Sequence, residues 1–413
     1  MAEKFLKQGY KICDVDENPD IVIVNTCTVT NIADRKSRQV LRKVKEENPK
    51  SIIVAVGCYV QVAKEKVQEM EEIDICLGNV EKKDIVTNVE KYINENKKIE
   101  IFDVNKEVEF QEMGAITFSE KTRATVKIQD GCNNFCTYCL IPYARGRVRS
   151  RNKENVIEEV TKIAKKGIKE IVITGIHIAS YGKDFENKYG LIDLLEELDK
   201  IDGIKRIRLG SLEPTIITEE FTKRLSNLKT ICNQFHLSLQ SGCDETLRRM
   251  NRKYSCEEFE KSTEILRKYF KNVNLTTDII VGFPGETKEE FENTYEFLSK
   301  IKFYKMHVFK YSPREGTIAA KMTNQIDGNI KEERSQKLIK LSNDNEKEYN
   351  EEYLGKKVDV LFEEEKNGLW SGYTSNYIKV FTKCSENLEN QIREVTIKEA
   401  KEQNLLGEIS WKK

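Results

Sequence analysis

Short apolar runs alternate with charged, helix-like segments along most of this 413-residue chain. The first two runs, residues 21–25 and 52–57, flank a charged stretch with helical periodicity at 34–47. Strands of this kind, joined by amphipathic helices, form parallel sheets. The sequence therefore predicts an α/β fold whose first domain, residues 1–115, is built on a parallel sheet.

A second series of apolar runs begins near Arg123 and predicts a second domain over residues 118–345. Its predicted strands are Thr125–Gln129, Glu170–Gly175, Arg206–Gly210, Gln234–Gln240, Thr277–Gly282 and Lys305–Tyr311. Six βα units of this size predict a partial barrel. In the last segment, 348–413, the pattern changes to short strands and predicts a small β-barrel.

Composition limits the environment and the partners of the chain. No run approaches the ~18 apolar residues of a membrane span, and the N-terminus lacks an apolar signal core, so a cytoplasmic location without a membrane partner is expected. The 69 basic and 69 acidic residues cancel, so net charge alone does not indicate nucleic-acid binding. In such a chain the 11 cysteines indicate metal or catalytic sites rather than disulfides.

Three of these cysteines, Cys132, Cys136 and Cys139, directly follow a predicted strand and the turn Asp130-Gly131. Spaced by three and two residues, they can hold three irons of a 4Fe-4S cluster and leave the fourth iron open. Zinc fits less well, because it usually takes four ligands from two CxxC pairs and the chain has no second pair. The alternative is three ordinary buried cysteines.

This loop resembles that of the radical S-adenosylmethionine (SAM) superfamily, which places an aromatic residue just before the third cysteine, as Tyr138 does here. The resemblance implies a partial (β/α)6 barrel, a catalytic 4Fe-4S cluster on the three cysteines, and SAM as the source of a 5′-deoxyadenosyl radical. It also implies a set of residues that contact SAM, for each of which the alternative is an ordinary turn residue. That set is Tyr138, Thr174, Gly175, Glu213, Ser238, Gln240 and Asp278.

Further motifs narrow the resemblance, over nearly the whole chain, to the methylthiotransferases. These motifs are Val24–Thr30, Gly57-Cys58-Tyr59, the basic run Arg145–Arg151 and the C-terminal barrel. The resemblance implies a Rossmann-like N-terminal domain, a C-terminal TRAM domain that binds RNA, and an auxiliary 4Fe-4S cluster with Cys27 and Cys58 as metal ligands. The implied partners are tRNA, a sulfur donor and an external reductant such as flavodoxin or ferredoxin.

The segment after Cys27 is most similar to the enzymes that add a methylthio group to C2 of N6-threonylcarbamoyladenosine at position 37 of tRNA. Two alternatives are methylthiolation of isopentenyladenosine in tRNA or of a ribosomal protein. A third alternative, from another class, is an RNA-binding protein with a non-catalytic cluster.

In that family the auxiliary cluster has a third cysteine ligand, in a strand and loop that would precede Glu3–Gln8. We expect a late start of the chain, with Cys13 or Cys76 as candidate substitutes, although a packed thiol is the favoured role of both. The remaining cysteines are expected to be structural; they are Cys232, Cys243, Cys256 and Cys384. The three histidines, His177, His236 and His307, are too few and too scattered along the sequence to predict a metal site, although His177 could line the barrel cavity.

Two sets of side chains are candidates for contact with RNA. The first is the basic run, whose position after the cluster loop favours phosphate contact over a solvated loop; it contains Arg145, Arg147, Arg149 and Arg151. The second is a mixture of aromatic and basic residues that suits stacking on single-stranded bases, although some of its rings must also form the core. It comprises Trp370, Tyr373, Tyr377, Lys379, Phe381 and Lys383.

Overall fold

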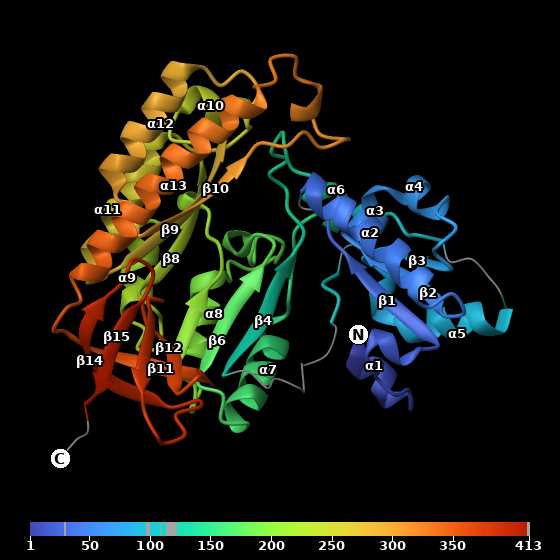
Figure 1. Ribbon diagram of the computed structural model, residues 1–413, viewed down its shortest axis with the longest axis horizontal. Coiled ribbons are helices and arrows are strands. Elements are labelled where there is room, and N and C mark those ends of the chain that lie inside the picture. The colour runs from blue at the N-terminus through green and yellow to red at the C-terminus, as the bar shows by residue number, and fades with distance from the viewer. Residues whose placement is uncertain (29, 96–99, 108, 113–121, 411–413) are drawn as a thin grey trace. The chain divides into compact units, whose positions relative to one another are not determined.

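The computed structural model describes residues 1–28, 30–95, 100–107, 109–112 and 122–410 (Figure 1). The chain forms two compact units. Unit one comprises Met1–Phe118, Asp130–Arg151 and Ser312–Lys321, and unit two comprises Ser119–Gln129, Asn152–Tyr311 and Met322–Lys413. The predicted boundary between the first two domains, at 115–118, lies outside the described residues. Each compact unit is made of three separate stretches of sequence. The predicted division into three consecutive domains is therefore not tested by these units and stays a prediction.

Unit one contains a parallel sheet of three strands in the order β1 (Ile21–Thr26), β2 (Ile52–Gly57) and β3 (Ile75–Leu77). Alternate residues of β2 face opposite sides, so Ile53 packs with α2 (Asn31–Glu47), and Val54 packs with α1 (Ala2–Lys7) and α5 (Ile85–Glu95). This arrangement confirms the predicted α/β layer.

The shorter elements of unit one complete its loops. They are α3 (Cys58–Val62), α4 (Lys64–Gln68), α6 (Ile141–Arg145), β5 (Arg149–Ser150) and the 3₁₀ turns η1 (Val15–Glu17), η2 (Glu81–Asp84) and η3 (Val104–Lys106). The long helix α2 begins where the Thr30 hydroxyl accepts a hydrogen bond from the Ala33 amide at 3.1 Å. This N-cap fixes the end of the loop that carries Cys27.

Unit two contains the six predicted barrel strands, all of which are confirmed. Strands β4 (Arg123–Asp130), β6 (Glu170–Gly175) and β7 (Arg206–Leu209) pair in parallel, as do β8 (Gln234–Gln240), β9 (Asn274–Val281) and β10 (Lys305–Lys310). Isolated parallel bridges, Ile207–Ile231 and Leu212–Leu237, connect the two groups. The strands therefore form the predicted partial barrel.

Helices cover one face of these strands, and the other face is the inner face of the barrel. The helices are α7 (Lys153–Lys165), α8 (Leu191–Leu198), α9 (Glu219–Ser226), α10 (Asp244–Arg249), α11 (Cys256–Tyr269), α12 (Lys288–Ile301) and α13 (Gly328–Glu351), with 3₁₀ turns η4 (Ile178–Ser180) and η5 (Pro214–Ile216). Leu237, Ile279 and Met306 point toward the helices and belong to the main hydrophobic core. Their sequence neighbours on each strand therefore point to the inner face. The 3₁₀ turn η6 (Ala319–Lys321) belongs to unit one. None of the described helices is both long and apolar enough to cross a membrane.

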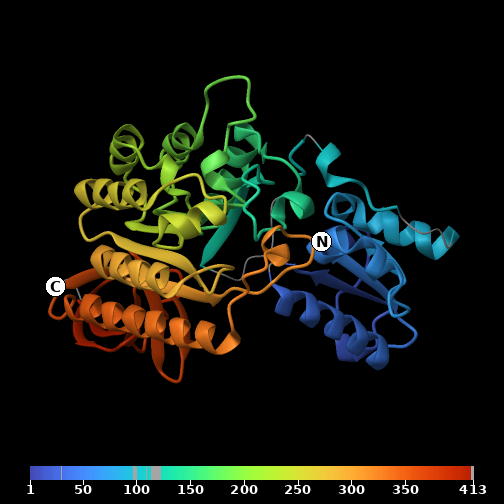
Figure 2. The same cartoon turned by 90° about the horizontal axis from the view of Figure 1, so that it is seen from above.

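The C-terminal segment is a closed β-barrel, as predicted. Its strands are β11 (Lys357–Lys366), β12 (Leu369–Thr374), β13 (Lys379–Lys383), β14 (Ile392–Ala400) and β15 (Leu405–Ile409), in the order β11-β12-β13-β15-β14. The sequence predicts strands at Val358–Glu363, Gly368–Thr374, Ile378–Thr382 and Glu394–Ile397, which correspond to the first four of these strands. It did not predict β15, because Leu-Leu-Gly-Glu-Ile is short and a glycine interrupts it. Figure 2 shows these strands in red beside α13 in orange.

Buried arginines join the small barrel to the larger one within unit two. The guanidinium of Arg206 donates to the carbonyls of Tyr373 and Asp359, both at 2.8 Å. Arg208 donates to the carbonyl of Ser375 at 3.1 Å and to the buried carboxylate of Glu170 at 3.1 Å. Charge-assisted hydrogen bonds of this kind are stronger than neutral ones, so they hold the loop after β12 against the sheet.

Candidate active site

The loop that carries the cysteine triplet lies in unit one, between β4 and α6, and its entry requires glycine. Gly131 has φ +74°, and a Cβ built on it would lie 1.8 Å from the carbonyl oxygen of Arg147. One residue later, the amide of Cys132 donates to the carbonyl of Gly146 at 3.0 Å. The start of the loop is therefore packed directly against the backbone of residues 146–147.

Backbone amides point at the sulfurs of this loop. The amide of Asn134 donates to Cys132 Sγ at 3.5 Å, and that of Ile141 donates to Cys139 Sγ at 3.4 Å. Burial raises the pKa of the Cys139 thiol to about 11, so binding iron at neutral pH must displace its proton. Three half-buried cysteines in one loop, with amides directed at two sulfurs, fit the ligand set of a 4Fe-4S cluster with one open iron.

Cys27 and Cys58 lie on adjacent loops of the same unit. Cys27 follows the last residue of β1 and Cys58 follows the last residue of β2; these residues, Thr26 and Gly57, are partners in the strand register. Because both strands run in parallel, both cysteines lie at the same carboxyl edge of the sheet, where α/β sheets place their sites. Cys27 is exposed and Cys58 is buried.

Two polar side chains lie next to this cysteine pair. The Asn79 amide donates to Cys58 Sγ at 3.5 Å and to a carbonyl of α6 at 2.7 Å. Burial lowers the pKa of Arg145, but the charges of Asp130, Cys58 and Cys27 together raise it above its ordinary value. The Arg145 guanidinium donates to the carboxylate of Asp130 at 3.4 Å. The two loops therefore present sulfur beside a fixed positive charge.

The other cysteines have mainly structural environments. Cys76 packs against the core of unit one, where its Sγ lies 3.9 Å from the Val67 carbonyl, which confirms a packed thiol. Cys13 is exposed, so a packed thiol is wrong for that residue, because the segment before η1 is not covered. The cysteines expected to be structural are buried or half-buried; these are Cys232, Cys243, Cys256 and Cys384.

The basic run after the cluster loop is mostly internal. Arg149 is only 4% exposed and Arg151 only 6%; they pair with Asp130 at 3.8 Å and Glu112 at 2.7 Å. Arg145 is half-buried and pairs with Asp130 at 3.4 Å, which leaves Arg147 as the exposed arginine of the four. The prediction that this run contacts phosphate is wrong for Arg149 and Arg151, because folding buries them against carboxylate partners. For Arg145 and Arg147 it stays a prediction.

Polar side chains converge on the inner face of the barrel in unit two, where SAM contacts are predicted. The carboxylate of Glu213 has two partners. His177 Nε2 lies 3.1 Å from one of its oxygens, and the Arg252 guanidinium forms an ion pair with the other at 3.5 Å. Arg252 also donates to the carbonyl of Ser238 at 3.2 Å, and the hydroxyls of Ser238 and Ser211 lie 2.6 Å apart. The structure thus connects Glu213 and Ser238 through Arg252, which the sequence did not single out.

Three of the remaining predicted contacts lie at the carboxyl ends of β6 and β8, and a fourth lies in the cysteine loop. Gly175 ends β6, where a Cβ would come within 2.9 Å of the Gln129 carbonyl, and Thr174 precedes it. Gln240 ends β8 with φ +75°, a conformation uncommon for a residue with a side chain. Tyr138 lies in the cysteine loop of unit one. Contact of these residues with SAM stays a prediction.

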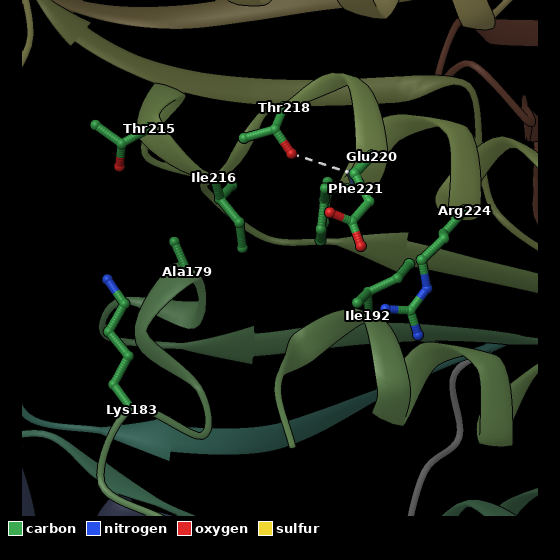
Figure 3. Close-up of a pocket in the computed structure, with 9 residues that line it drawn as sticks. All are labelled: Ala179, Lys183, Ile192, Thr215, Ile216, Thr218, Glu220, Phe221 and Arg224. Atoms are coloured by element: carbon green, nitrogen blue, oxygen red, sulfur yellow. Dashed lines mark hydrogen bonds between the residues drawn. The ribbon is translucent and has the colours of Figure 1, made fainter. Parts of the chain in front are cut away.

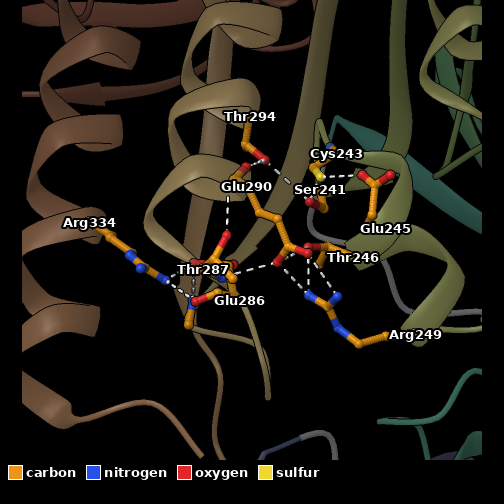
Figure 4. A network of polar contacts seen from close by, with 11 residues as sticks. Ser241, Cys243, Glu245, Thr246, Arg249, Glu286, Thr287, Glu290, Thr294 and Arg334 are labelled. Atoms are coloured by element: carbon orange, nitrogen blue, oxygen red, sulfur yellow. Dashed lines mark hydrogen bonds and ion pairs between the residues drawn. The ribbon is translucent and has the colours of Figure 1, made fainter. Parts of the chain in front are cut away.

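An ion-pair network holds the loops that follow β8 and β9 (Figure 4). Arg249 donates twice to the carboxylate of Glu290, at 2.8 and 2.6 Å. Glu286 accepts from the amide of Gly282 at 3.0 Å and pairs with Arg334 of α13. Both loops at this end of the barrel are therefore fixed by buried or half-buried charges.

Two histidines and an aspartate meet further along the inner face. Ligand atoms of His236, Asp278 and His307 all lie within 4.8 Å of one another. The expectation that the histidines are scattered is therefore wrong for His236 and His307, because β8, β9 and β10 are adjacent parallel strands. Each of the three residues lies next to an apolar core residue on one of three consecutive predicted strands. This polar–apolar alternation was the sequence signal that could have identified the group. The third histidine, His177, has hydrogen-bond partners for both ring nitrogens, so it is a satisfied histidine.

A shallow cavity of about 330 Å³ lies between α8 and α9 (Figure 3). Arg224 at its rim is already bound to Asp193 at 2.7 Å and to Glu196 at 2.9 Å. The polar side chains that the cavity offers to a ligand are therefore those of Lys183, Thr215 and Glu220 rather than that of Arg224. Its lining residues are Ala179, Lys183, Ile192, Thr215, Ile216, Thr218, Glu220, Phe221 and Arg224.

The aromatic residues of the C-terminal barrel divide into internal and surface groups. Trp370 belongs to the barrel core. Tyr373 and Tyr377 stack on each other with ring centroids 4.7 Å apart, and the Arg208 guanidinium lies 4.4 Å from the Tyr377 centroid.

Phe381 instead lines a surface cavity of about 520 Å³ that also contains two lysines, two glutamates and apolar strand residues. One of the lysines, Lys398, pairs with Glu408 at 3.4 Å, so Lys383 is the lysine of the cavity that forms no ion pair with the described residues. Of the predicted stacking rings, Phe381 is therefore the one placed beside lysines in a surface cavity.

Comparison with known families matches three consecutive parts of the chain. Residues 1–78 match the uncharacterized protein family UPF0004, residues 126–298 match the radical SAM superfamily, and residues 351–410 match the TRAM domain. Among solved structures, the radical SAM methyltransferase TsrM from Kitasatospora setae matches with a TM-score of 0.56 at 14% identity, over 86% of this chain and 69% of that chain. At this identity the likeness shows the fold alone.

Curated relatives match over most of their length. The threonylcarbamoyladenosine tRNA methylthiotransferase MtaB of Bacillus subtilis is 41% identical, over 96% of this chain and 89% of the relative. The enzyme of that name from Aquifex aeolicus is 39% identical, over 92% of both chains. The tRNA-2-methylthio-N(6)-dimethylallyladenosine synthase of Clostridium novyi is 39% identical, over 86% of this chain and 80% of the relative. With its radical SAM cysteine loop and barrel, this chain is an enzyme of the radical SAM methylthiotransferase family.

Proposed function

We propose that this enzyme adds a methylthio group to C2 of N6-threonylcarbamoyladenosine at position 37 of tRNA. The observation that carries the proposal is the 41% identity to a threonylcarbamoyladenosine tRNA methylthiotransferase across 96% of the chain. The geometry supports it, because one compact unit contains both the cysteine triplet and the pair Cys27 and Cys58. A methylthiotransferase needs one site that activates a C–H bond and one that presents sulfur.

The cysteines have separate roles in this proposal. Cys132, Cys136 and Cys139 would hold the radical cluster, which together with SAM would supply the radical chemistry that activates the C–H bond. Cys27 and Cys58 are ligands of an auxiliary cluster that presents sulfur. Hydrogen bonds from neighbouring groups orient metal-ligating side chains and tune them, which is the role assigned to Asn79 at Cys58. Arg145 places a positive charge beside the same cysteine. Residues proposed to bind SAM are Tyr138, Thr174, Gly175, Glu213, Ser238 and Gln240.

The partners follow from the same chemistry. An external reductant such as flavodoxin or ferredoxin supplies the electron that cleaves SAM, and a sulfur donor replaces the sulfur that leaves with each product. The TRAM barrel binds tRNA through the surface cavity that contains Phe381 and Lys383. An aromatic ring beside lysines suits an unstacked base and its phosphate.

The decisive assay uses anaerobically reconstituted enzyme with SAM, a reductant and sulfide. The substrate is tRNA that carries N6-threonylcarbamoyladenosine, and the nucleosides are analysed by mass spectrometry after digestion. The proposal expects a product in which one hydrogen of the base is replaced by a methylthio group. The Cys136→Ala variant, prepared in parallel, should give no product.

The second candidate substrate is dimethylallyladenosine, also called isopentenyladenosine, because relatives named for it are 36–39% identical to this chain. A tRNA that carries this nucleoside is the matched competitor in the same assay. Product from this tRNA alone would replace the proposed substrate with the second. Ribosomes without tRNA test the ribosomal-protein alternative, and tRNA binding without turnover would indicate a non-catalytic cluster.

The number of clusters is measured separately from activity. Two 4Fe-4S clusters correspond to about eight irons and one cluster to about four. About eight irons and an equal amount of sulfide per chain would support the auxiliary cluster on Cys27 and Cys58. About four irons would mean that this polypeptide forms the radical cluster without the sulfur-presenting one.

A further inference from the structure

His236, Asp278 and His307 form a compact group that the proposed reaction does not use. The Nε2 atom of His236 lies 3.2 Å from Oδ2 of Asp278. The rings of His236 and His307 have centroids 5.8 Å apart, and the three ligand atoms lie within 4.8 Å of one another. In the part of the chain that the structure describes, this is the one group of three such side chains at this spacing.

The backbone explains why the three side chains converge. His307 is the register partner of Asp278 across β10 and β9, and His236 lies on β8, the neighbour of β9 on the other side. Each is flanked by a residue that points into the helix-covered core. All three therefore project from rigid strands onto the inner face, without contributions from loops.

A second layer of hydrogen bonds orients His236. Its Nδ1 lies 3.0 Å from the Thr276 hydroxyl, which in turn accepts from the amide of Gln234 at 3.3 Å. With Nδ1 engaged by Thr276, the other ring nitrogen is directed toward Asp278. A ligating histidine is held in the same way, with one nitrogen on the metal and the other bonded to a neighbouring group.

We propose that His236, Asp278 and His307 bind one divalent transition-metal ion, distinct from the iron–sulfur clusters. Two imidazoles and one carboxylate on one face are the donor set of mononuclear Fe²⁺ sites, and two histidines with a carboxylate also bind Zn²⁺. Three protein ligands leave coordination positions open toward the inner face of the barrel. Those positions take water or an oxygen donor of a bound ligand.

A histidine–aspartate ion pair alone would explain two of the three residues, but not the third. His307 is exposed, and the described residues provide no hydrogen-bond partner for its ring. An ion gives all three donors a common partner. This assignment replaces the SAM contact that the family resemblance implies for Asp278.

The test titrates Zn²⁺ into anaerobically reconstituted enzyme, because zinc is counted independently of the iron in the clusters. Elemental analysis after equilibrium dialysis gives zinc and iron per chain. X-ray absorption at the zinc edge distinguishes nitrogen and oxygen ligands at about 2.0–2.1 Å from sulfur ligands at about 2.3 Å. The proposal expects one zinc per chain, with nitrogen and oxygen ligands only and with the iron content unchanged.

Variants locate the bound zinc. Loss of a ligand in His307→Ala or Asp278→Asn should weaken zinc binding by about 100-fold or more, and Thr276→Val by roughly 10-fold, as for changes to groups around metal ligands. His307 is exposed, so its replacement should leave the fold and the iron content intact. His177→Gln is the matched control, since His177 lies in a different network, and it should bind zinc as the wild type does.

Three results would overturn the proposal. They are absence of stoichiometric zinc, a sulfur shell around the zinc, and unchanged affinity in both His307→Ala and Thr276→Val. The experiment measures zinc binding and needs no tRNA, so its outcome does not depend on the tRNA substrate proposed above.

Discussion

Replacing Gly131 by alanine should remove the radical cluster while leaving most of the fold intact. The new Cβ would lie 1.8 Å from the Arg147 carbonyl oxygen, a contact with backbone that a side-chain rotation cannot relieve. The left-handed conformation at φ +74° costs an alanine about 1–2 kcal/mol. Overpacking typically adds about 1–3 kcal/mol. The loop that carries Cys132 must therefore shift, at a total cost of roughly 2–5 kcal/mol.

The chain offers a matched control for this change. Gly167 has φ +82°, but a Cβ built there has no atom within 4 Å. Gly167→Ala should therefore cost only the conformational part, about 1–2 kcal/mol. Comparison of the two variants isolates the contact at Gly131 from the strain that both share.

The assay measures iron per chain and the cleavage of SAM to 5′-deoxyadenosine and methionine. Gly131→Ala should lose about four irons, one cluster's share, together with SAM cleavage, whereas Gly167→Ala should keep both. A lower thermal midpoint is expected for each variant, and it should be lower for Gly131→Ala. Wild-type iron and SAM cleavage in Gly131→Ala would show that the loop tolerates the Cβ, and the packing argument would fail.

Three further changes test other parts of the molecule. Cys136→Ala should abolish SAM cleavage. Cys384 is a half-buried cysteine of the small barrel, and Cys384→Ala should leave cleavage unchanged. SAM cleavage by Cys136→Ala would contradict the assignment of Cys136 as a cluster ligand. Arg206→Met removes two hydrogen bonds to the small barrel and should destabilise the protein by about 3–6 kcal/mol in chemical denaturation, since each bond to a charged group contributes about 1.5–3 kcal/mol. Phe381→Ala should weaken tRNA binding by about 1–3 kcal/mol through lost stacking, and Lys383→Ala should reduce its salt dependence. If filter binding shows the same tRNA affinity for both variants as for the wild type, the cavity that contains Phe381 and Lys383 is not the RNA-binding site.

Periodicity predicted the strands well because burial on one face leaves a pattern in the sequence. Strands β6 and β8 begin and end where the apolar runs do, at Glu170–Gly175 and Gln234–Gln240. Strand β15 has no such run, since closure of the barrel, rather than a hydrophobic pattern, determines its pairing.

The candidate site was only partly predictable, because many of its partners are distant in sequence. The spacing of the triplet is local and was readable. By contrast, nothing in the sequence indicated that Arg149 and Arg151 form ion pairs, because their partners, Asp130 and Glu112, are 19 and 39 residues away along the chain. The role of His307 depends on strands that only the folded sheet places side by side.

The bond network around Asn79 has a consequence for how the chain can be divided. A single side chain bridges Cys58, from the first hundred residues, to α6, which directly follows the triplet. Residues 312–321 join the same unit, where the Arg314 guanidinium donates to the Thr28 hydroxyl at 2.7 Å. An expression fragment cut anywhere between residues 151 and 312 would therefore separate pieces of this unit. The cysteine triplet and the pair Cys27 and Cys58 belong to one compact unit. A fragment that disrupts this unit would therefore disturb both sets of cysteines.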